Sequence, residues 1–120
     1  HTYPAWESKL IDEALAYTIE NIQRVQAALP GKPLAILEAG WASIASEFVD
    51  NASEVNQTRY FEELNDWADR ANMTVFFFEA FDEPWKGDPD NPLGAEKHWG
   101  LFKVDRTPKP AIKILREHER

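Results

Sequence analysis

Two short apolar runs constrain the fold of this chain more than any other feature. Leu34–Leu37 and Val75–Phe78 are too short for helices, and each follows a longer segment with helical periodicity. A continuous apolar run of this length predicts a strand that is buried on both faces. Strands that alternate with helices form βα units, so the sequence predicts an α/β fold with a parallel sheet.

Periodicity and capping residues mark the helices that flank these strands. Residues 9–29 place apolar side chains near a 3.6-residue period, with Ser8 as the expected cap and Pro30-Gly31 as the expected end. Ser53 is expected to cap the second helix. The last helix is expected to open at Thr107-Pro108, because proline is favoured in the first helical turn. The apolar side of the second helix comprises Val55, Phe61, Leu64, Trp67, Ala68 and Ala71.

Two strands are too few for a free-standing parallel sheet, which needs cover on both faces and a partner at each edge. The sequence has no internal repeat or linker, and Pro84 to Gly94 is predicted to be a loop because it is rich in Gly, Asp, Asn and Pro. We therefore interpret residues 1–120 as part of a single barrel domain whose other strands lie outside this chain. The chain lacks a starting Met and opens in mid-pattern, so we expect it to be cut from something longer.

The composition excludes several classes of partner and chemistry. The formal net charge of −8 argues against nucleic acid and against an anionic membrane surface, since both call for clustered Lys and Arg. The absence of cysteine excludes disulfides and thiolate catalysis but does not fix the compartment. His1, His98 and His118 show no metal-ligand spacing, so we assign no metal. Five Trp, three Tyr and seven Phe favour stacking platforms for a neutral ligand.

The first predicted strand runs into a carboxylate, Glu38, just before Gly40-Trp41. Because desolvating an ion is costly, a charge at the end of an apolar run needs a reason. One interpretation is a catalytic carboxylate at the carboxyl end of a barrel strand. The alternative is a structural carboxylate that caps a neighbouring amide or pairs with Lys86. From strand-end position alone, both stay open.

The second predicted strand also runs into a carboxylate, Glu79, and Phe81, Glu83, Trp85 and Lys86 follow it. Glycoside cleavage uses two carboxyl groups, together with aromatic faces that grip the sugar ring. The alternative for Glu83 and Lys86 is an ordinary surface pair worth less than about 1 kcal/mol. The tryptophans could equally pack the open end of a barrel.

Four segments carry a resemblance to a known family. Ile36–Ser43 resembles the Glu-x-Gly-Trp-Pro signature of glycoside hydrolase family 17, the β-1,3-glucanases and β-1,3-glucanosyltransferases. Phe78–Lys86 resembles the next strand end of that family. Glu96–Phe102, followed by Pro108-Lys109, is similar to its closing motif, and Tyr3–Trp6 is similar to the end of the preceding strand. The resemblance covers essentially all 120 residues.

The resemblance implies a (β/α)8 TIM barrel, of which this chain is the C-terminal portion, from the end of strand 6 to helix 8. It implies that Glu38 is the nucleophile, which attacks the anomeric carbon and forms a covalent glycosyl-enzyme intermediate, with Lys86 nearby to keep it ionised. Glu83 and Lys86 match a Glu and a Lys of the cleft, and Glu96 matches a further carboxylate. The other cleft candidates are Tyr3, Trp41, Glu79, Phe81 and Trp85.

The chain departs from the family pattern in two places. Ala42 replaces the usual proline after Gly-Trp, which points away from plant members, and we expect a bacterial-type chain. The general acid of the family belongs to an Asn-Glu pair at the end of strand 4, and these 120 residues contain no such dipeptide. Glu79 could in principle supply a second carboxyl, although the family gives it no such role. General acid catalysis is worth ~10²–10⁴-fold, so the chain alone is not expected to be an efficient enzyme.

We therefore expect part of a retaining endo-1,3-β-glucanase that acts on β-glucan oligo- or polysaccharide without a metal or organic cofactor. A β-1,3-glucanosyltransferase is the alternative within the family. A non-catalytic glucan-binding fragment is a second alternative. A third is a piece that completes a barrel only with a missing N-terminal segment or another chain. The expected location is periplasmic, secreted or attached to the outer face of a membrane, with the signal or anchor outside this chain.

Overall fold

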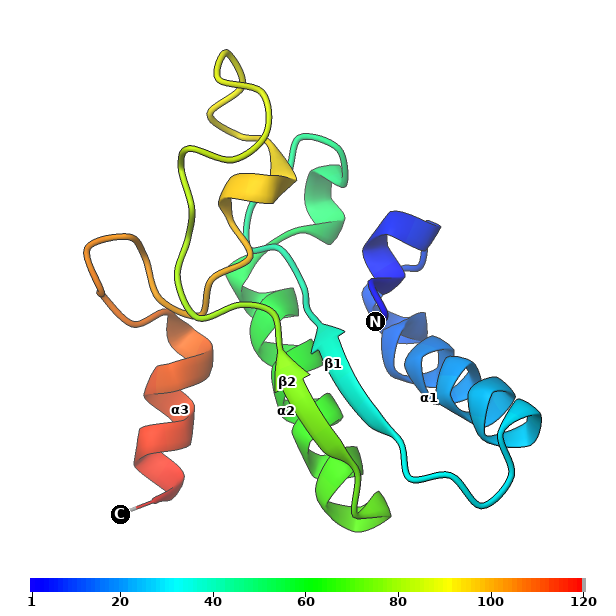
Figure 1. Cartoon of the computed structure of the whole chain (residues 1–120). Coiled ribbons are helices and arrows are strands. Elements are labelled where there is room, and N and C mark those ends of the chain that lie inside the picture. Colours follow the sequence, from blue (N-terminus) through cyan, green and yellow to red (C-terminus); the bar gives the residue numbers. More distant parts are fainter. Residues whose placement is uncertain (120) are drawn as a thin grey trace.

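The structure is a computed structural model that describes residues 1–119, and it alternates helices and strands (Figure 1). Three short 3-10 helices, labelled η, stand between the main elements. In chain order the elements are η1 (Pro4–Glu7), α1 (Ile11–Ala28), β1 (Ala35–Ala39), η2 (Val49–Asn51), α2 (Glu54–Ala71), β2 (Thr74–Phe77), η3 (Ala95–Lys97) and α3 (Pro110–His118).

The two strands form a parallel pair, which confirms the predicted α/β class. Ala35 lies opposite Thr74 and Ile36 opposite Val75. Two isolated bridges extend the parallel order on either side of the pair. Thr2 bridges Ala39 at one edge, and Phe81 bridges Phe102 beyond the end of β2. Four segments of the chain thus run side by side in the same direction, as consecutive strand ends of a barrel do.

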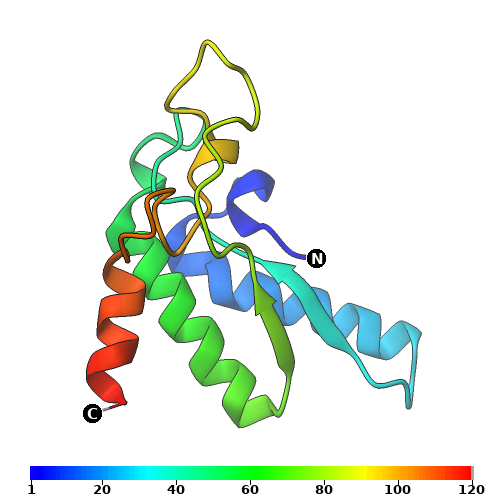
Figure 2. The same ribbon diagram turned by 60° about the vertical axis from the view of Figure 1, so that its left-hand side comes forward.

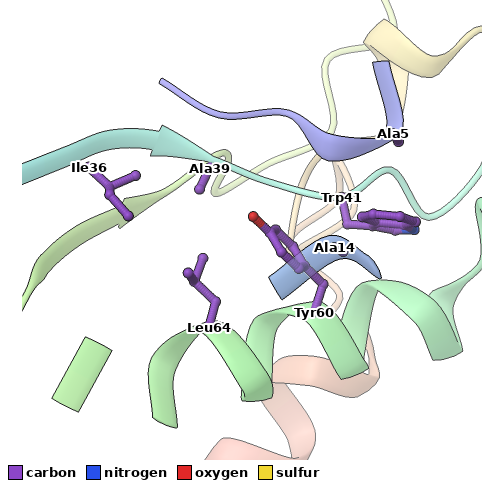
Figure 3. Packing of buried hydrophobic residues seen from close by; sticks show 7 residues of the cluster. All are labelled: Ala5, Ala14, Ile36, Ala39, Trp41, Tyr60 and Leu64. Atoms are coloured by element: carbon purple, nitrogen blue, oxygen red, sulfur yellow. The ribbon is translucent and has the colours of Figure 1, made fainter. Parts of the chain in front are cut away.

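One face of the strand pair packs on helices. Figure 3 shows Ile36 and Ala39 of β1 pointing toward Tyr60 and Leu64 of α2, with Trp41 beside them. All five side chains are buried, and Tyr60 is further fixed by a 2.7 Å hydrogen bond between its hydroxyl and that of Thr18 in α1. Burial of this apolar surface holds α1 and α2 to the back of the strands.

The prediction that both strands are buried on both faces is wrong for the described residues. Leu37 and Phe76 are each 58% exposed, on the face opposite to the helices. Successive side chains of a strand point to opposite faces, and the helices cover only one of them. In a closed barrel the other face is filled by side chains from the remaining strands.

Two of the expected helix starts are also wrong. Leu10, not Ser8, precedes α1, and the Glu13 side chain accepts a hydrogen bond from the Leu10 N–H. Ser8 instead ends η1, in a left-handed conformation. The last helix begins at Pro110, because the chain first pairs Pro108 with Phe102.

The start of α2 is confirmed. The Ser53 hydroxyl accepts a hydrogen bond from the N–H of Asn56, as an N-cap should. Phe61, Leu64 and Ala68 are buried as expected. Val55 is 76% exposed, because this first-turn residue lies off the face that packs on the strands.

The long loops gather at the carboxyl ends of β1 and β2 (Figures 1 and 2). The segment between β2 and η3 projects beyond this end, and the N-terminal η1 lies near it in both views. The candidate functional residues are therefore carried by loops on a packed scaffold. Within residues 1–119, the helices are too short or too polar to cross a bilayer.

Candidate functional site

A pocket of about 430 Å³ opens at the carboxyl ends of the strands. It brings together residues from η1, β1, the end of β2 and the segment that includes η3. Its walls combine aromatic rings with two carboxylates and one ammonium. The lining residues are Tyr3, Trp6, Glu38, Phe78, Lys86, Glu96 and Trp99.

Glu38 is the penultimate residue of β1, and its side chain is 34% exposed in this pocket. The Tyr3 hydroxyl donates a 2.6 Å hydrogen bond to Glu38 Oε2, and His1 Nδ1 lies 3.0 Å from the same oxygen. Burial and the hydrogen bond to Glu38 raise the pKa of Tyr3 above its usual range. Tyr3 therefore stays protonated and remains a donor to Glu38.

The backbone and the aromatic rings together fix Tyr3. The Thr2 N–H donates to the Glu38 carbonyl at 2.9 Å, which ties the N-terminal segment to β1. The Tyr3 ring then meets the edges of Trp99 and Phe78, with ring centroids 5.3 and 5.8 Å apart. Such edge-to-face contacts are favourable and directional, so they fix both the position of the Tyr3 ring and the direction of its hydroxyl.

The end of β2 carries a second, more enclosed cluster. Lys86 forms an ion pair with Glu83, and its Nζ lies 3.8 Å from Glu79 Oε2. The Glu79 side chain is only 15% exposed. Burial and the neighbouring Glu83 raise the pKa of Glu79 to about 7, against the opposing effect of Lys86. The hydrogen bond to Glu83 raises the pKa of Lys86. Glu79 is thus a carboxyl that holds a proton near neutrality.

Lys86 lies in the pocket of Glu38, as expected, but among residues 1–119 its ion pairs are with Glu83 and Glu79. Both of these carboxylates belong to the segment that follows β2 and also carries Lys86. The Tyr3 hydroxyl is instead the closest donor to Glu38. The structural alternative, a Glu38–Lys86 pair, is absent from the described residues as well.

Trp41 does not line a sugar subsite in this structure. It is fully buried against Tyr60, and its indole N–H donates to the Asn51 carbonyl at 2.9 Å. Phe81 and Trp85 are exposed, at 44% and 70%, but they lie outside the pocket of Glu38. The structure brings Tyr3, Glu38, Lys86 and Glu96 together in that pocket, with Glu79 and Glu83 bordering it through Lys86.

Three aromatic residues line the pocket that were not selected from the sequence. Trp6 belongs to the Tyr-Pro-Ala-Trp segment, and its ring packs on Phe48. Phe78 and Trp99 contact Tyr3 from two different segments. Glu96 of η3 and Trp99, three residues later, line this pocket, while Lys97 and His98 line a different one. All three aromatic residues lie in segments that resemble the family, and this was the sequence signal that could have identified them.

A buried polar network links the segments that follow β1 and β2. Lys109, with a 2% exposed side chain, donates to Asp82 at 2.7 Å and to Ser43 at 2.9 Å. Asp82 also accepts from the N–H of Gly100. Burial lowers the pKa of Lys109, although the hydrogen bond to Asp82 opposes this. The buried Gln57 amide donates to the carbonyls of Trp41 and Gly100. Segments that follow both strands are thereby joined.

Gly40 brings the two strand ends into direct backbone contact. A Cβ atom at this position would lie 2.0 Å from the carbonyl oxygen of Phe78. Only glycine fits such an approach without moving the backbone. The residue two places after Glu38 therefore touches the residue just before Glu79.

No group of three or more His, Cys, Asp and Glu side chains within residues 1–119 is arranged to hold a metal ion. The chemistry available in the described part of the site is that of carboxylates, a phenol, an ammonium and aromatic faces. These groups suit recognition of a neutral, hydroxyl-rich ligand.

Comparison with known proteins assigns this arrangement to a family. The model of the BtgE/BtgC glycoside hydrolase domain matches residues 1–100. The glycoside hydrolase family 17 β-1,3-glucanosyltransferase of Rhizomucor miehei, also solved as an active-site mutant with laminaritriose, is 33% identical and superposes with a TM-score of 0.82 over 92% of this chain. An endo-laminarinase from Formosa is 31% identical, with a TM-score of 0.77 over 91% of this chain. These neighbours confirm the fold class, part of a (β/α)8 barrel.

Among curated proteins, a glucan 1,3-beta-glucosidase of Candida albicans is 36% identical over 76 residues, which is 62% of this chain. The matched part spans 25% of that enzyme, and 40% of the Rhizomucor structure. The curated relatives are fungal, so the expectation of a bacterial-type chain is not supported.

Proposed function

The chain belongs to the BtgE/BtgC glycoside hydrolase family, and from this membership we propose that it forms the nucleophile-bearing part of an enzyme that cleaves β-1,3-glucan. The observation that carries the proposal is Glu38. It lies at the carboxyl end of a parallel strand, in an aromatic pocket, with a tyrosine hydroxyl bonded to one of its oxygens.

The proposed reaction is a double displacement. A Glu38 carboxylate oxygen attacks the anomeric carbon, and the bond between that carbon and the glycosidic oxygen breaks. The leaving oxygen takes a proton from a general acid that lies outside these 120 residues. Water then attacks the anomeric carbon of the glycosyl-enzyme, loses a proton to the same acid–base group and frees Glu38. Two inversions give overall retention of configuration.

The contacts of Glu38 suit this role. Tyr3 and His1 both approach Oε2, which leaves Oε1 as the oxygen without a hydrogen-bond partner among the described residues. We assign the attack to Oε1. The hydrogen bond from Tyr3 fixes the orientation of the carboxylate and weakens as the carboxylate loses its charge to the new bond, so Tyr3 is proposed to orient the nucleophile.

The remaining lining residues are proposed to bind the sugar. The exposed ring of Trp6 suits the C–H side of a pyranose ring, and Glu96 and Lys86 can accept from and donate to its hydroxyls. Trp99 is 1% exposed and is proposed to support Tyr3 from the core. Glu79 and Glu83 are proposed to act through Lys86 at the edge of the same site. Trp85 and Phe81, which are exposed nearby in the chain, are kept as candidates for more distant sugar units.

A β-1,3-glucanosyltransferase is the second candidate, because the Rhizomucor neighbour is one. The first half of the reaction is the same, and a sugar hydroxyl replaces water in the second half.

We further propose that the enzyme acts outside the cytoplasm, since a glucan polymer does not cross a membrane. Fractionation of the source cells tests this location.

The decisive experiment is Glu38→Gln in the full-length polypeptide that carries these residues. Loss of the nucleophile should lower kcat on a laminarin-type β-1,3-glucan by more than about 10³-fold. Laminaritriose should still bind, because glutamine keeps the shape of the side chain. Glu117→Gln, on the exposed end of α3, is the matched control and should keep full activity.

Full activity of Glu38→Gln would overturn the assignment of the nucleophile. The products of the unmodified protein separate the two candidates, because a hydrolase gives only shorter oligosaccharides whereas a transferase also gives longer ones. Binding of laminaritriose with no products of either kind would favour the non-catalytic alternative.

A further inference from the structure

Lys97 is a buried lysine with an unusual set of partners. Its residue is 5% exposed, and its Nζ donates to the carbonyl oxygens of Lys86 and Asp88, each at 2.6 Å. Within residues 1–119 it forms no ion pair with a carboxylate. Burying an ammonium is costly, and carbonyl dipoles compensate for only part of that cost. A buried ammonium held only by backbone carbonyls fixes the backbone that carries them.

The two carbonyls belong to the turn that carries the Lys86 ammonium. The Lys86 N–H donates to the Glu83 carbonyl at 3.0 Å, which closes the turn at one end. Lys97 then holds the carbonyl of the same residue, Lys86, from the other side. The backbone of Lys86 is therefore fixed through both its N–H and its carbonyl.

The fit around this turn is close. Gly87 has a φ of +73°, and a Cβ there would lie 3.3 Å from the Glu96 Cβ and 3.6 Å from Lys97 Nζ. The turn thus rests directly on η3, with Gly87 allowing the left-handed conformation. Lys97 faces the turn while its neighbour Glu96 faces the pocket of Glu38.

We propose that Lys97 is a positioning residue: its buried ammonium anchors the turn at Lys86 and Asp88 and so sets where the Lys86 ammonium lies between Glu79 and Glu83. This inference does not depend on the identity of the sugar or on which enzyme activity is present. Under this proposal η3 supports the segment that follows β2, in addition to the ion pair between Asp82 and Lys109.

The position of Lys86 can be followed through the titration of Glu79. Lys86 lowers the pKa of Glu79, whereas burial, Glu83 and Asp82 raise it. Tyr3, whose hydroxyl is sensitive to the charge of Glu79, borders the same site. If the Lys86 ammonium moves away, the lowering effect weakens and Glu79 titrates at a higher pH.

The experiment is a pH titration of the side-chain carboxyl carbons of Glu residues by 13C NMR in the intact polypeptide. Glu79→Gln identifies the Glu79 signal by its loss. Lys86→Met should raise the titration midpoint of Glu79 by about half a pH unit or more. This shift is the reference for complete loss of the Lys86 charge. Lys97→Met should raise the midpoint in the same direction, by a smaller amount.

Two controls separate positioning from general destabilisation. Thr18→Val removes a buried hydrogen bond between α1 and α2, so it should lower the melting temperature without moving the Glu79 midpoint. These 120 residues contain no cysteine, so Lys97→Cys, made in a polypeptide from which any cysteine outside them has been removed, can be alkylated at one thiol with 2-bromoethylamine in the unfolded state and refolded. This restores an ammonium on a side chain of lysine length, and the midpoint should return to the unmodified value.

If Lys97→Met unfolds, Gly87→Ala disturbs the same turn while it keeps the ammonium, and it should also raise the midpoint. The proposal is overturned if Lys86→Met shifts Glu79 but the folded Lys97 and Gly87 variants do not. It is equally overturned if Lys86→Met leaves the midpoint unchanged, or if Thr18→Val shifts it as much as Lys97→Met does.

Discussion

The ends of β1 and β2 carry the same residue type in different surroundings. Glu38 is 34% exposed and accepts a hydrogen bond from a neutral hydroxyl, that of Tyr3. Glu79 is 15% exposed and lies beside Glu83 and Lys86, and its pKa rises to about 7. Strand-end position brings both carboxyls to one edge of the sheet, but their neighbours determine what each can do. The first is placed as a hydrogen-bond acceptor, which suits the proposed nucleophile, and the second as a group that holds a proton.

The largest expected difference between the two ends is in stability. Lys109→Met leaves Asp82, whose side chain is only 14% exposed, without its charged partner, which should lower the free energy of unfolding by about 3–5 kcal/mol. Glu38→Gln removes no buried pair and should change it by about 1 kcal/mol or less. Urea unfolding of both variants makes the comparison. Equal losses would mean that the β2 end has no special anchor.

The double variant Asp82→Asn with Lys109→Met serves as the control. It removes both charges, so it should recover part of the stability that Lys109→Met loses. A double variant that is no more stable than the single one would assign the loss to packing of the lysine stem instead.

A moderate effect is expected when the hydroxyl at the β1 end is removed. Tyr3→Phe keeps the ring contacts with Trp99 and Phe78 but deletes the donor to Glu38. We expect kcat/KM for a β-1,3-glucan to fall about 10-fold, since one hydrogen bond to a charged group is worth roughly 1.5 kcal/mol or more. Tyr17→Phe on α1 is the matched control. An unchanged kcat/KM in Tyr3→Phe would remove Tyr3 from the proposed machinery.

The smallest effect concerns pH and belongs to the β2 end. Because the pKa of Glu79 is raised in the folded state, the folded protein holds more protons than the unfolded chain between about pH 4.5 and 7. The contribution of this carboxyl to the free energy of unfolding is therefore fully present below about pH 4.5 and is lost as the pH rises to about 7 and above. Glu79→Gln stays neutral and should remove this component.

Urea midpoints of the unmodified protein and of Glu79→Gln, measured from pH 4 to 8, test this expectation. The difference between the two proteins should grow in favour of Glu79→Gln as pH rises. Parallel curves would show that Glu79 ionises at its ordinary pH in the folded protein.

The sequence was sufficient for the parts of the fold that local patterns determine. The alternation of strands and helices, the Ser53 cap and the buried side of α2 followed from periodicity and capping chemistry. The start of α3 did not, because a bridge between Pro108 and Phe102 delays the helix until Pro110. That bridge joins residues through tertiary structure and leaves no local signal.

Prediction of the site was limited in the same way. Glu38 and the residues after β2 stood out because carboxylates interrupt apolar runs, and Tyr3 and Glu96 came only from the family resemblance. The choice of Trp41 as a sugar platform failed, since the hydrogen bond to the Asn51 carbonyl that holds its ring in the core depends on η2, ten residues away. The role of Lys97 could not be predicted, because its partners are backbone carbonyls and carry no sequence pattern.

The contact of Gly40 with Phe78 gives a physical meaning to the Glu-x-Gly-Trp signature. Of its three specified residues, only the glutamate faces the pocket. The glycine is required by a neighbouring carbonyl, and the tryptophan fills the core between β1 and α2. Two of the three specified residues thus serve packing, one against the next strand end and one in the core, and only the glutamate bears on which bond is cleaved. A sequence that keeps Gly-Trp but replaces the glutamate would be expected to retain this shape and lose the chemistry.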